Sequence, residues 1–201
     1  SIGLYSQHWS QQNTQMAGTY TAVNQVSVVD SNIVWVNGWN GSNQGGFIKA
    51  MARTKDQGTT WIPGSYAGLG TYVRPTDLCG VSYNKAFCVA YDTAAGVGSF
   101  WKTTNGGNSW TMVAGVLNNG TTSFADGVKF WDHGKGFCYG DPVNNYFEIY
   151  TTSDSGSTWN PVNISHIPVS LSGEYGYNGS MCASIVPGGV GFFITNKGRV
   201  F

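Results

Sequence analysis

The stretch Thr54–Trp61, TKDQGTTW, decides the fold of this chain, because two later stretches repeat its pattern. It returns as TTNGGNSW at residues 103–110 and as TSDSGSTW at residues 152–159. The shared phrase is Thr-x-Asp/Asn-x-Gly-x-Ser/Thr-Trp, and its closing tryptophans are 49 residues apart in both intervals. A constant period of this size predicts stacked structural units of similar shape.

Each copy of the phrase has the chemistry of a tight turn. Asp or Asn can bond its own backbone, and Gly readily adopts a positive φ. Strand-like runs on both sides predict a hairpin, and the final indole can pack between neighbouring sheets. If the phrase were an acid or metal site, its middle copy would need an ionisable residue at the position of Asp56 and Asp154. That residue is Asn105, which cannot ionise. We therefore assign the phrase to architecture, through Asp56, Gly58, Trp61, Asn105, Gly107, Trp110, Asp154, Gly156 and Trp159.

The segments between the phrases consist of short β-branched and aromatic runs without a helical period. We expect inner strands at residues 25–29, 79–83, 127–131 and 181–186. The units are expected at residues 10–61, 62–110, 111–159 and, incompletely, 160–201. This organisation predicts an all-β fold made of four-stranded blades around a common axis.

The phrase resembles the Asp-box, or BNR repeat, of sialidases, xyloglucanases, sortilin-type receptors and photosystem II assembly-factor-like proteins. The segment from Phe124 through Asp132 to Val143, together with Gly173-Glu174, resembles photosystem II stability-factor-like and BNR-repeat glycosyl-hydrolase-like bacterial proteins. This resemblance implies a β-propeller with the box between the two outer strands of each blade, and a secreted protein. Since propellers close with about four to eight blades, we expect about four blades here, within a larger propeller of six to eight.

The composition excludes several classes of function. The 201 residues have no formal net charge, and charged residues are 10% of the chain, which gives no electrostatic basis for binding nucleic acid. No apolar run reaches the length of about 18 residues that suggests a membrane helix. The surface rich in Asn, Ser and Thr favours an extracellular, cell-surface or periplasmic location.

The cysteines and histidines are dispersed, so the sequence predicts no metal site and no cofactor. Cys79 and Cys88 would lie on adjacent antiparallel strands, where they could form a disulfide. The alternative is that all four cysteines, Cys79, Cys88, Cys138 and Cys182, are small buried side chains.

Acidic residues at strand ends supply the candidates for catalysis. Asp77 and Asp126 are expected where inner strands begin, and Asp92 and Asp141 where second strands end. These positions share one face of an antiparallel blade, and Glu174 precedes the fourth inner strand. A pair of carboxyl groups with one raised pKa would suit a retaining or inverting glycoside hydrolase. The alternative is that these residues cap turns.

A sialidase would in addition need three arginines that converge on the substrate carboxylate, as the family resemblance implies. The chain has Arg53, Arg74 and Arg199, and only Arg74 lies in a loop that leads to an inner strand. The sequence therefore disfavours a sialidase.

Aromatic residues near the same face favour binding without catalysis. Trp39 and Tyr91 lie close to the ends of second strands, and Tyr66, Tyr72, Tyr146, Tyr175 and Tyr177 lie in or beside loops. Concave aromatic surfaces with few polar groups suit sugars and peptides. We expect a binding scaffold for glycan or protein, with Trp39, Tyr91, Asp92 and Asp141 as ligand contacts. Asp92 or Asp141 could also bind Ca²⁺, although no calcium-loop pattern is present. The alternatives are a glycoside hydrolase and an assembly factor within a larger membrane complex.

Overall fold

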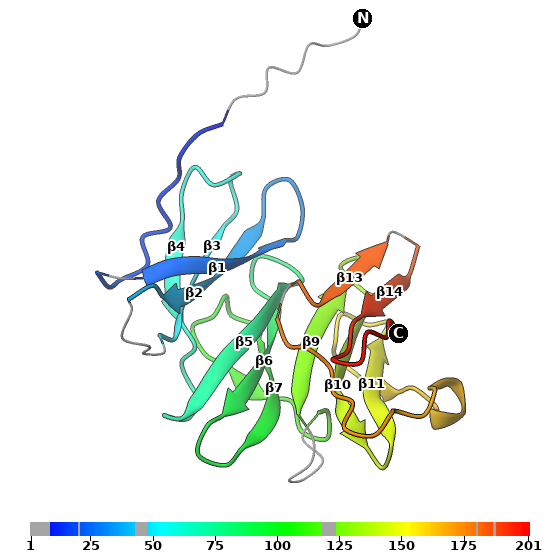
Figure 1. Cartoon of the computed structure of the whole chain (residues 1–201). Helices are drawn as coiled ribbons and strands as arrows, with labels where there is room; N and C mark the ends of the chain where they lie inside the picture. The colour runs from blue at the N-terminus through cyan, green and yellow to red at the C-terminus, as the bar shows by residue number, and fades with distance from the viewer. Residues whose placement is uncertain (1–8, 20, 43–47, 118–123, 180, 187) are drawn as a thin grey trace, which may run out of the picture.

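The structure is a computed structural model and describes residues 9–19, 21–42, 48–117, 124–179, 181–186 and 188–201 (Figure 1). The first sheet contains β1 (Thr21–Val28), β2 (Val34–Asn40), β3 (Ala50–Thr54) and β4 (Ile62–Ser65). The second contains β5 (Val73–Gly80), β6 (Ala86–Asp92), β7 (Val97–Thr103) and β8 (Thr111–Met112). The third contains β9 (Ala125–Phe130), β10 (Gly136–Val143), β11 (Tyr146–Thr152) and β12 (Asn160–Pro161). The fourth contains β13 (Ala183–Val186) and β14 (Val190–Phe193), after a short 3₁₀ turn, η1 (Ile164–His166).

The sheets are up-and-down antiparallel units, each built from strands that follow one another in the sequence. Their first strands also adjoin in chain order, since β1 contacts β5, β5 contacts β9, and β9 contacts β13. Figure 1 shows the sheets following one another around these strands. The predicted all-β, propeller-type fold is confirmed. The fourth sheet has two strands in the described residues, with a bridge between Ile194 and Val200 beyond them.

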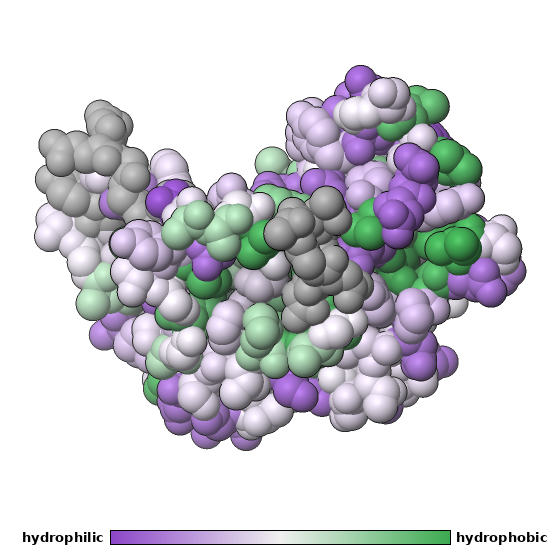
Figure 2. Space-filling view, turned by 90° about the horizontal axis from the view of Figure 1, so that it is seen from below, coloured by the Kyte–Doolittle hydropathy of each residue, from purple (hydrophilic) through white to green (hydrophobic). Residues whose placement is uncertain are grey.

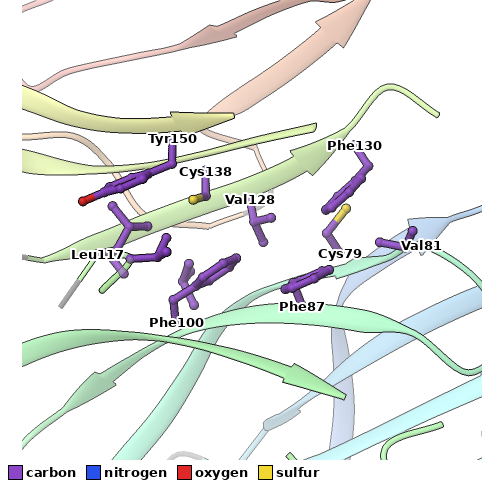
Figure 3. Packing of buried hydrophobic residues seen from close by; sticks show 12 residues of the cluster. Cys79, Val81, Phe87, Phe100, Leu117, Val128, Phe130, Cys138 and Tyr150 are labelled. Carbon is purple, nitrogen blue, oxygen red and sulfur yellow. The ribbon is translucent and has the colours of Figure 1, made fainter. Parts of the chain in front are cut away.

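The apolar core lies between successive sheets. One buried cluster, with Trp35, Met51 and Tyr66, joins the first sheet to the second. The next cluster joins the second sheet to the third (Figure 3) and includes Phe87, Phe100, Leu117, Val128 and Cys138. A third cluster joins the third sheet to the fourth and contains Phe137, Tyr139, Phe147, Ile167 and Phe193. A sheet therefore buries both of its faces only if another sheet packs against each of them.

The eight-residue phrases lie between the third and fourth strands of the three complete sheets. In the last copy, Thr152 Oγ1 accepts a hydrogen bond from Gly156 N at 2.9 Å, and Asp154 Oδ1 accepts one from Thr158 N at 2.9 Å. Gly156 has φ = 72°, in the left-handed region that favours glycine. These bonds hold the pKa of Asp154 down, to about 2, with the backbone N–H of Thr158 as the main cause.

Asn105 makes the equivalent bonds in the middle copy, where its Oδ1 accepts from Ser109 N at 3.0 Å and its Nδ2 donates to Ser109 Oγ at 2.9 Å. We therefore expect Asp154→Asn to leave the melting temperature nearly unchanged and Asp154→Ala to lower it, because alanine has no acceptor for Thr158 N. Thermal unfolding followed by circular dichroism measures both. Equal destabilisation by Asn and Ala would show that the charge of Asp154, rather than its hydrogen-bond geometry, stabilises the turn.

The four cysteines are free, so a Cys79–Cys88 disulfide is absent. In the sheet register, Cys79 pairs with Phe87 and Leu78 pairs with Cys88. Cys79 and Cys88 therefore point to opposite faces of the sheet, because successive side chains alternate. Cys79 packs towards the third sheet and Cys88 towards the first. The alternative interpretation, small buried side chains, describes Cys79, Cys88 and Cys138, whereas Cys182 is partly exposed.

The predicted inner strands agree with β1, β9 and β13 to within a few residues, but the second one is displaced. We expected residues 79–83, and β5 occupies Val73–Gly80. The sequence placed Arg74 in the loop before this strand and Asp77 at its start, whereas both lie within β5. Pro75 also lies within β5, next to a β-bulge.

In the described part of the chain, no helix has the length and apolar character needed to cross a bilayer.

Candidate functional site

The site is the face of the sheets on which the first strands begin and the second strands end, here called the start face. In three sheets, a register shift in the pairing of first and second strands leaves one residue of the first strand unpaired: Asn24, Thr76 and Asp126. A β-bulge of this kind re-aims the side chain it carries. Polar residues of the start face thus lie at β-bulges, and the constant repeat period of the sequence does not reveal where a bulge occurs.

Asp77 lies one residue beyond the bulge of β5 and is fully buried. Its carboxylate accepts hydrogen bonds from Gln25 Nε2 of the first sheet and from Val128 N of the third sheet, the latter at 3.1 Å. It also forms a salt bridge with Lys129 Nζ at 3.2 Å. Asp77 therefore ties three first strands together, and its oxygens are committed to that role.

Gln25 has the same place in the first sheet that Asp77 has in the second. Its Oε1 accepts from Leu78 N at 2.9 Å, as Asp77 accepts from Val128 N. The corresponding residue of the third sheet is Gly127, where a Cβ would collide with the ring of Tyr139. Tyr139 makes the link from the third sheet to the next segment instead: its hydroxyl donates to Tyr177 O at 3.0 Å.

Asp126 and Asp141 form the one pair of candidate carboxyl groups that lie close enough in the described structure for each to affect the other's pKa. Asp126 is 1% exposed, and neither of its oxygens has a hydrogen-bond partner in the described residues. Two neighbouring ionised carboxylates repel each other, so the buried pair retains a proton.

The pair holds that proton tightly. Burial first, and then the neighbouring Asp141 charge, raise the pKa of Asp126 to about 9. Burial also raises the pKa of Asp141, although a hydrogen bond from Gly176 N, at 2.8 Å, and the interaction with Asp126 oppose the shift. At neutral pH, Asp126 is therefore the protonated member of the pair. A Cβ on Gly176 would collide with Asp126 Oδ2, so the segment before β13 closes over the pair.

The remaining two carboxylates also have partners within the fold. Asp92 accepts from Ala94 N at 2.8 Å and Ala95 N at 3.0 Å, which makes it a turn cap. Glu174 is 6% exposed and accepts from Leu171 N, Thr195 Oγ1 and Arg199. Among the described residues, no group of three or more His, Cys, Asp or Glu could hold a metal ion.

The predicted aromatic contacts divide between surface and interior. Trp39 is 52% exposed at the end of β2, and Tyr72, which precedes β5, is 61% exposed. Tyr175 and Tyr177 precede the fourth sheet, where their exposed rings meet edge to face with centroids 5.8 Å apart. Tyr91 is half-buried against Phe124 at 5.0 Å. Tyr66, expected in or beside a loop, follows β4 directly and is buried, and its hydroxyl donates to Asn37 Oδ1 at 2.7 Å.

Hollows at the centre of the molecule confirm that the first strands converge. One, of about 240 Å³, has walls from β1, β5, β9 and β13. A second, of about 220 Å³, is lined by Asn24, Gln25 and Thr76 on one side and by Asn178, Gly179, Met181 and Cys182 on the other. Figure 2 views the molecule from the side on which β9 begins and shows a mostly pale surface on which hydrophilic and hydrophobic residues are scattered.

Comparisons with known proteins support the fold. No family model and no curated protein matches the chain. Among solved structures, an ancestral GH74 enzyme aligns with 90% of this chain and 26% of its own length, at 13% identity and a TM-score of 0.53. YCF48 from Cyanidioschyzon merolae aligns over 90% of this chain and 50% of its own length, at 16% identity and a TM-score of 0.51.

A structure of YCF48 bound to D1 peptide is 21% identical, with a TM-score of 0.47 over 92% of this chain and 61% of that one. The chain thus spans half to three fifths of the length of both YCF48 structures. At these identities the likeness shows the β-propeller fold alone, in agreement with the fold expected from the box phrases.

Proposed function

We propose that the chain is a non-catalytic β-propeller scaffold that binds a glycan or protein ligand on its start face. The observation that carries this proposal is a contrast between two kinds of side chain. The aromatic rings Trp39, Tyr72, Tyr175 and Tyr177 are exposed there, whereas the carboxyl groups of Asp77, Asp126 and Glu174 are buried, and those of Asp77 and Glu174 are bonded within the protein. A secreted or cell-surface location forms part of the proposal.

Exposed aromatic rings suit such a ligand because they combine an apolar face with a polar tip. Asp92 and Asp141 would contribute at most a polar margin, since their oxygens already accept backbone hydrogen bonds. A surface with few charges favours a neutral extended chain over a strongly charged one. Tyr91, whose ring contacts that of Phe124 at an interplanar angle of 40°, would provide a preorganised platform between the second and third sheets.

A glycoside hydrolase is the second candidate, and the raised pKa of Asp126 favours it, because a general acid needs such a shift. The geometry points the other way. Hydrolase carboxyl groups stand on either side of a sugar that fits between them, whereas Gly176, whose N–H donates to Asp141 Oδ1, packs so closely on Asp126 that a Cβ there would collide with Asp126 Oδ2. Asp126 is also 1% exposed, which leaves a substrate no access in this conformation. An assembly role in a membrane complex remains a prediction from the family resemblance.

The binding proposal predicts that Trp39→Ala and Tyr175→Ala each weaken ligand binding about tenfold, a loss of about 1.4 kcal/mol. The physical reason is that each substitution removes an exposed ring that would be covered by ligand. A glycan array and a peptide library identify the ligand, and isothermal titration calorimetry measures the change. Glycan hits and peptide hits separate the two ligand classes.

Trp9→Ala is the matched control, because Trp9 is 92% exposed and lies outside the start face, in the segment before β1. Its binding should equal that of the unmodified protein. If Trp9→Ala weakened binding as much as Trp39→Ala, or if neither start-face substitution had an effect, the ligand would lie elsewhere.

A further inference from the structure

Two of the exposed tyrosine rings of the start face belong to residues 174–178, here called the tyrosine segment, which lies directly over Asp126 and Asp141. Gly176 N of this segment donates a hydrogen bond to Asp141 Oδ1 at 2.8 Å. Gly176 also packs so closely on Asp126 that an added Cβ would collide with Asp126 Oδ2. The position of the segment therefore depends on these two carboxyl groups.

The other bonds of the tyrosine segment come from groups that do not change charge near neutral pH. The Tyr139 hydroxyl donates to Tyr177 O at 3.0 Å. Asn196 Oδ1 accepts from Tyr175 N at 2.9 Å, and Asn196 N donates to Tyr175 O at 3.1 Å. The contacts with the two carboxyl groups are thus the ones that a change of protonation can break.

The closed position of the segment requires a protonated Asp126. This residue is 1% exposed and its oxygens have no hydrogen-bond partner in the described residues, so an ionised Asp126 would have neither water nor a donor to stabilise its charge. The charge of Asp141 beside it would add repulsion. If the tyrosine segment moved away, water could reach both carboxylates, so ionisation favours an open segment.

The other ionisable groups that face Asp126 do not compete with this titration. Burial raises the pKa of Tyr139 on β10 and of Cys182, which precedes β13, so both stay neutral when Asp126 ionises last among the carboxyl groups. From the first strands of the second and third sheets, Asp77 and Lys129 face the same region and are paired in a salt bridge at 3.2 Å.

We propose that Asp126 and Asp141 form a pH-sensitive latch: protonated Asp126 holds the tyrosine segment in its ligand-binding position, and ionisation releases the segment and weakens ligand binding. The part about ligand binding rests on the proposed function, whereas the opening of the segment can be measured without a ligand. Gly173 and Gly179, with φ of 66° and 107°, flank the segment and provide the hinges.

The sign of the effect follows from proton linkage. The closed segment holds a proton that the open segment releases, so the closed state is favoured at low pH. Opening then becomes more favourable by up to about tenfold for each pH unit. This increase continues until the pH reaches about 9, the pKa of Asp126 in the closed state.

Hydrogen exchange measured by mass spectrometry tests the opening in the whole chain. The reporter is the peptide that contains Gly176 N and Tyr177 N, which are both hydrogen-bonded in the closed segment. Labelling at pH 6, 7 and 8, corrected for the intrinsic exchange rate at each pH, should show protection that falls by up to about tenfold per pH unit. In Asp126→Asn, protection should not depend on pH. The segment should exchange faster than β6 at each pH, because it opens without unfolding of the sheets.

Two further variants separate the latch from general effects on the fold. Tyr139→Phe removes a bond to Tyr177 O that does not titrate, so it should lower protection by a similar factor at every pH. Asp154→Asn is the matched control, because the pKa of Asp154 is held at about 2 and this residue is ionised throughout. Its protection should follow that of the unmodified chain.

The ligand arm of the test uses calorimetry with the glycan or peptide that the library identifies. Affinity should fall by at least about fivefold between pH 6 and pH 9 in the unmodified chain and stay constant in Asp126→Asn. Segment protection that is independent of pH, that falls equally in Asp126→Asn, or that equals the protection of β6 would overturn the latch. Opening with an affinity that does not change would overturn its link to binding. If no ligand is found, the proposed function fails, whereas the exchange result still decides the latch.

Discussion

Asp77→Asn is expected to lower the free energy of unfolding by about 3–5 kcal/mol, the usual cost of breaking a buried ion pair by removing one partner. The substitution leaves the Lys129 ammonium, whose side chain is 13% exposed, without its counter-ion. It also replaces one carboxylate oxygen by an amide group that faces the donors Gln25 Nε2 and Val128 N. Urea unfolding at pH 7 measures the loss.

Asp126→Asn should have the opposite effect and raise the free energy of unfolding at pH 7 by up to about 4 kcal/mol. In the folded protein the pKa of Asp126 is about 9, against 3.8 for an unperturbed aspartate. The folded state therefore holds a proton that the unfolded state releases at neutral pH. Asparagine is uncharged, so it removes the cost of keeping that proton.

The pH dependence of the free energy of unfolding follows from the same raised pKa of Asp126. The stability that Asp126 contributes is fully present below pH 4 and is lost as pH rises from about 4 to 9, by up to about 1.4 kcal/mol per pH unit. Asp126→Asn should flatten this decline. Urea unfolding at pH 5, 7 and 9 compares the two proteins, and parallel profiles would mean that Asp126 is ionised in the fold.

Trp159→Ala is the second substitution with a large expected effect, a loss of about 3–5 kcal/mol. It removes the ring that packs on Phe87, Phe100 and Phe130 between two sheets. Trp61 occupies the same place in its phrase but has no preceding sheet among the described residues, and its Nε1 donates to Gln12 Oε1 at 3.2 Å.

Trp61→Ala should therefore cost only about 1 kcal/mol, as for an ordinary point substitution. Chemical denaturation of both variants gives the comparison. Equal losses would show that the tryptophan stabilises its own turn. They would contradict the interpretation that Trp159 stabilises the fold by packing between two sheets.

The fold followed from the sequence because a recurring turn at a constant interval constrains the whole chain. The phrase located each outer hairpin, and the expected inner strands lie within a few residues of β1, β9 and β13. The strand expected at residues 79–83 was wrong, because β5 already begins at Val73. The pairing of Cys79 with Cys88 failed for a related reason, since a one-residue offset in register moves a side chain to the other face.

The candidate site was only partly predictable, because β-bulges do not follow the repeat. Asp77 and Asp126 are 49 residues apart and were expected to be equivalent. Asp77 is in register with Val89, whereas Asp126 is the bulged residue, and Gly127 takes the place of Asp77. Gln25, which the sequence did not single out, has the Asp77 role in the first sheet. The sequence feature that could have identified Gln25 is a polar residue between the apolar residues of a strand.

The central claim is that the start face binds a ligand without cleaving it. The most direct test incubates the chain with the glycan that it binds and measures both the released reducing ends and the affinity, for the unmodified protein and for an Asp126→Asn/Asp141→Asn double variant. The account predicts no release from either protein and the same affinity for both. Reducing ends released by the unmodified protein and abolished in the double variant would contradict it and establish a glycoside hydrolase.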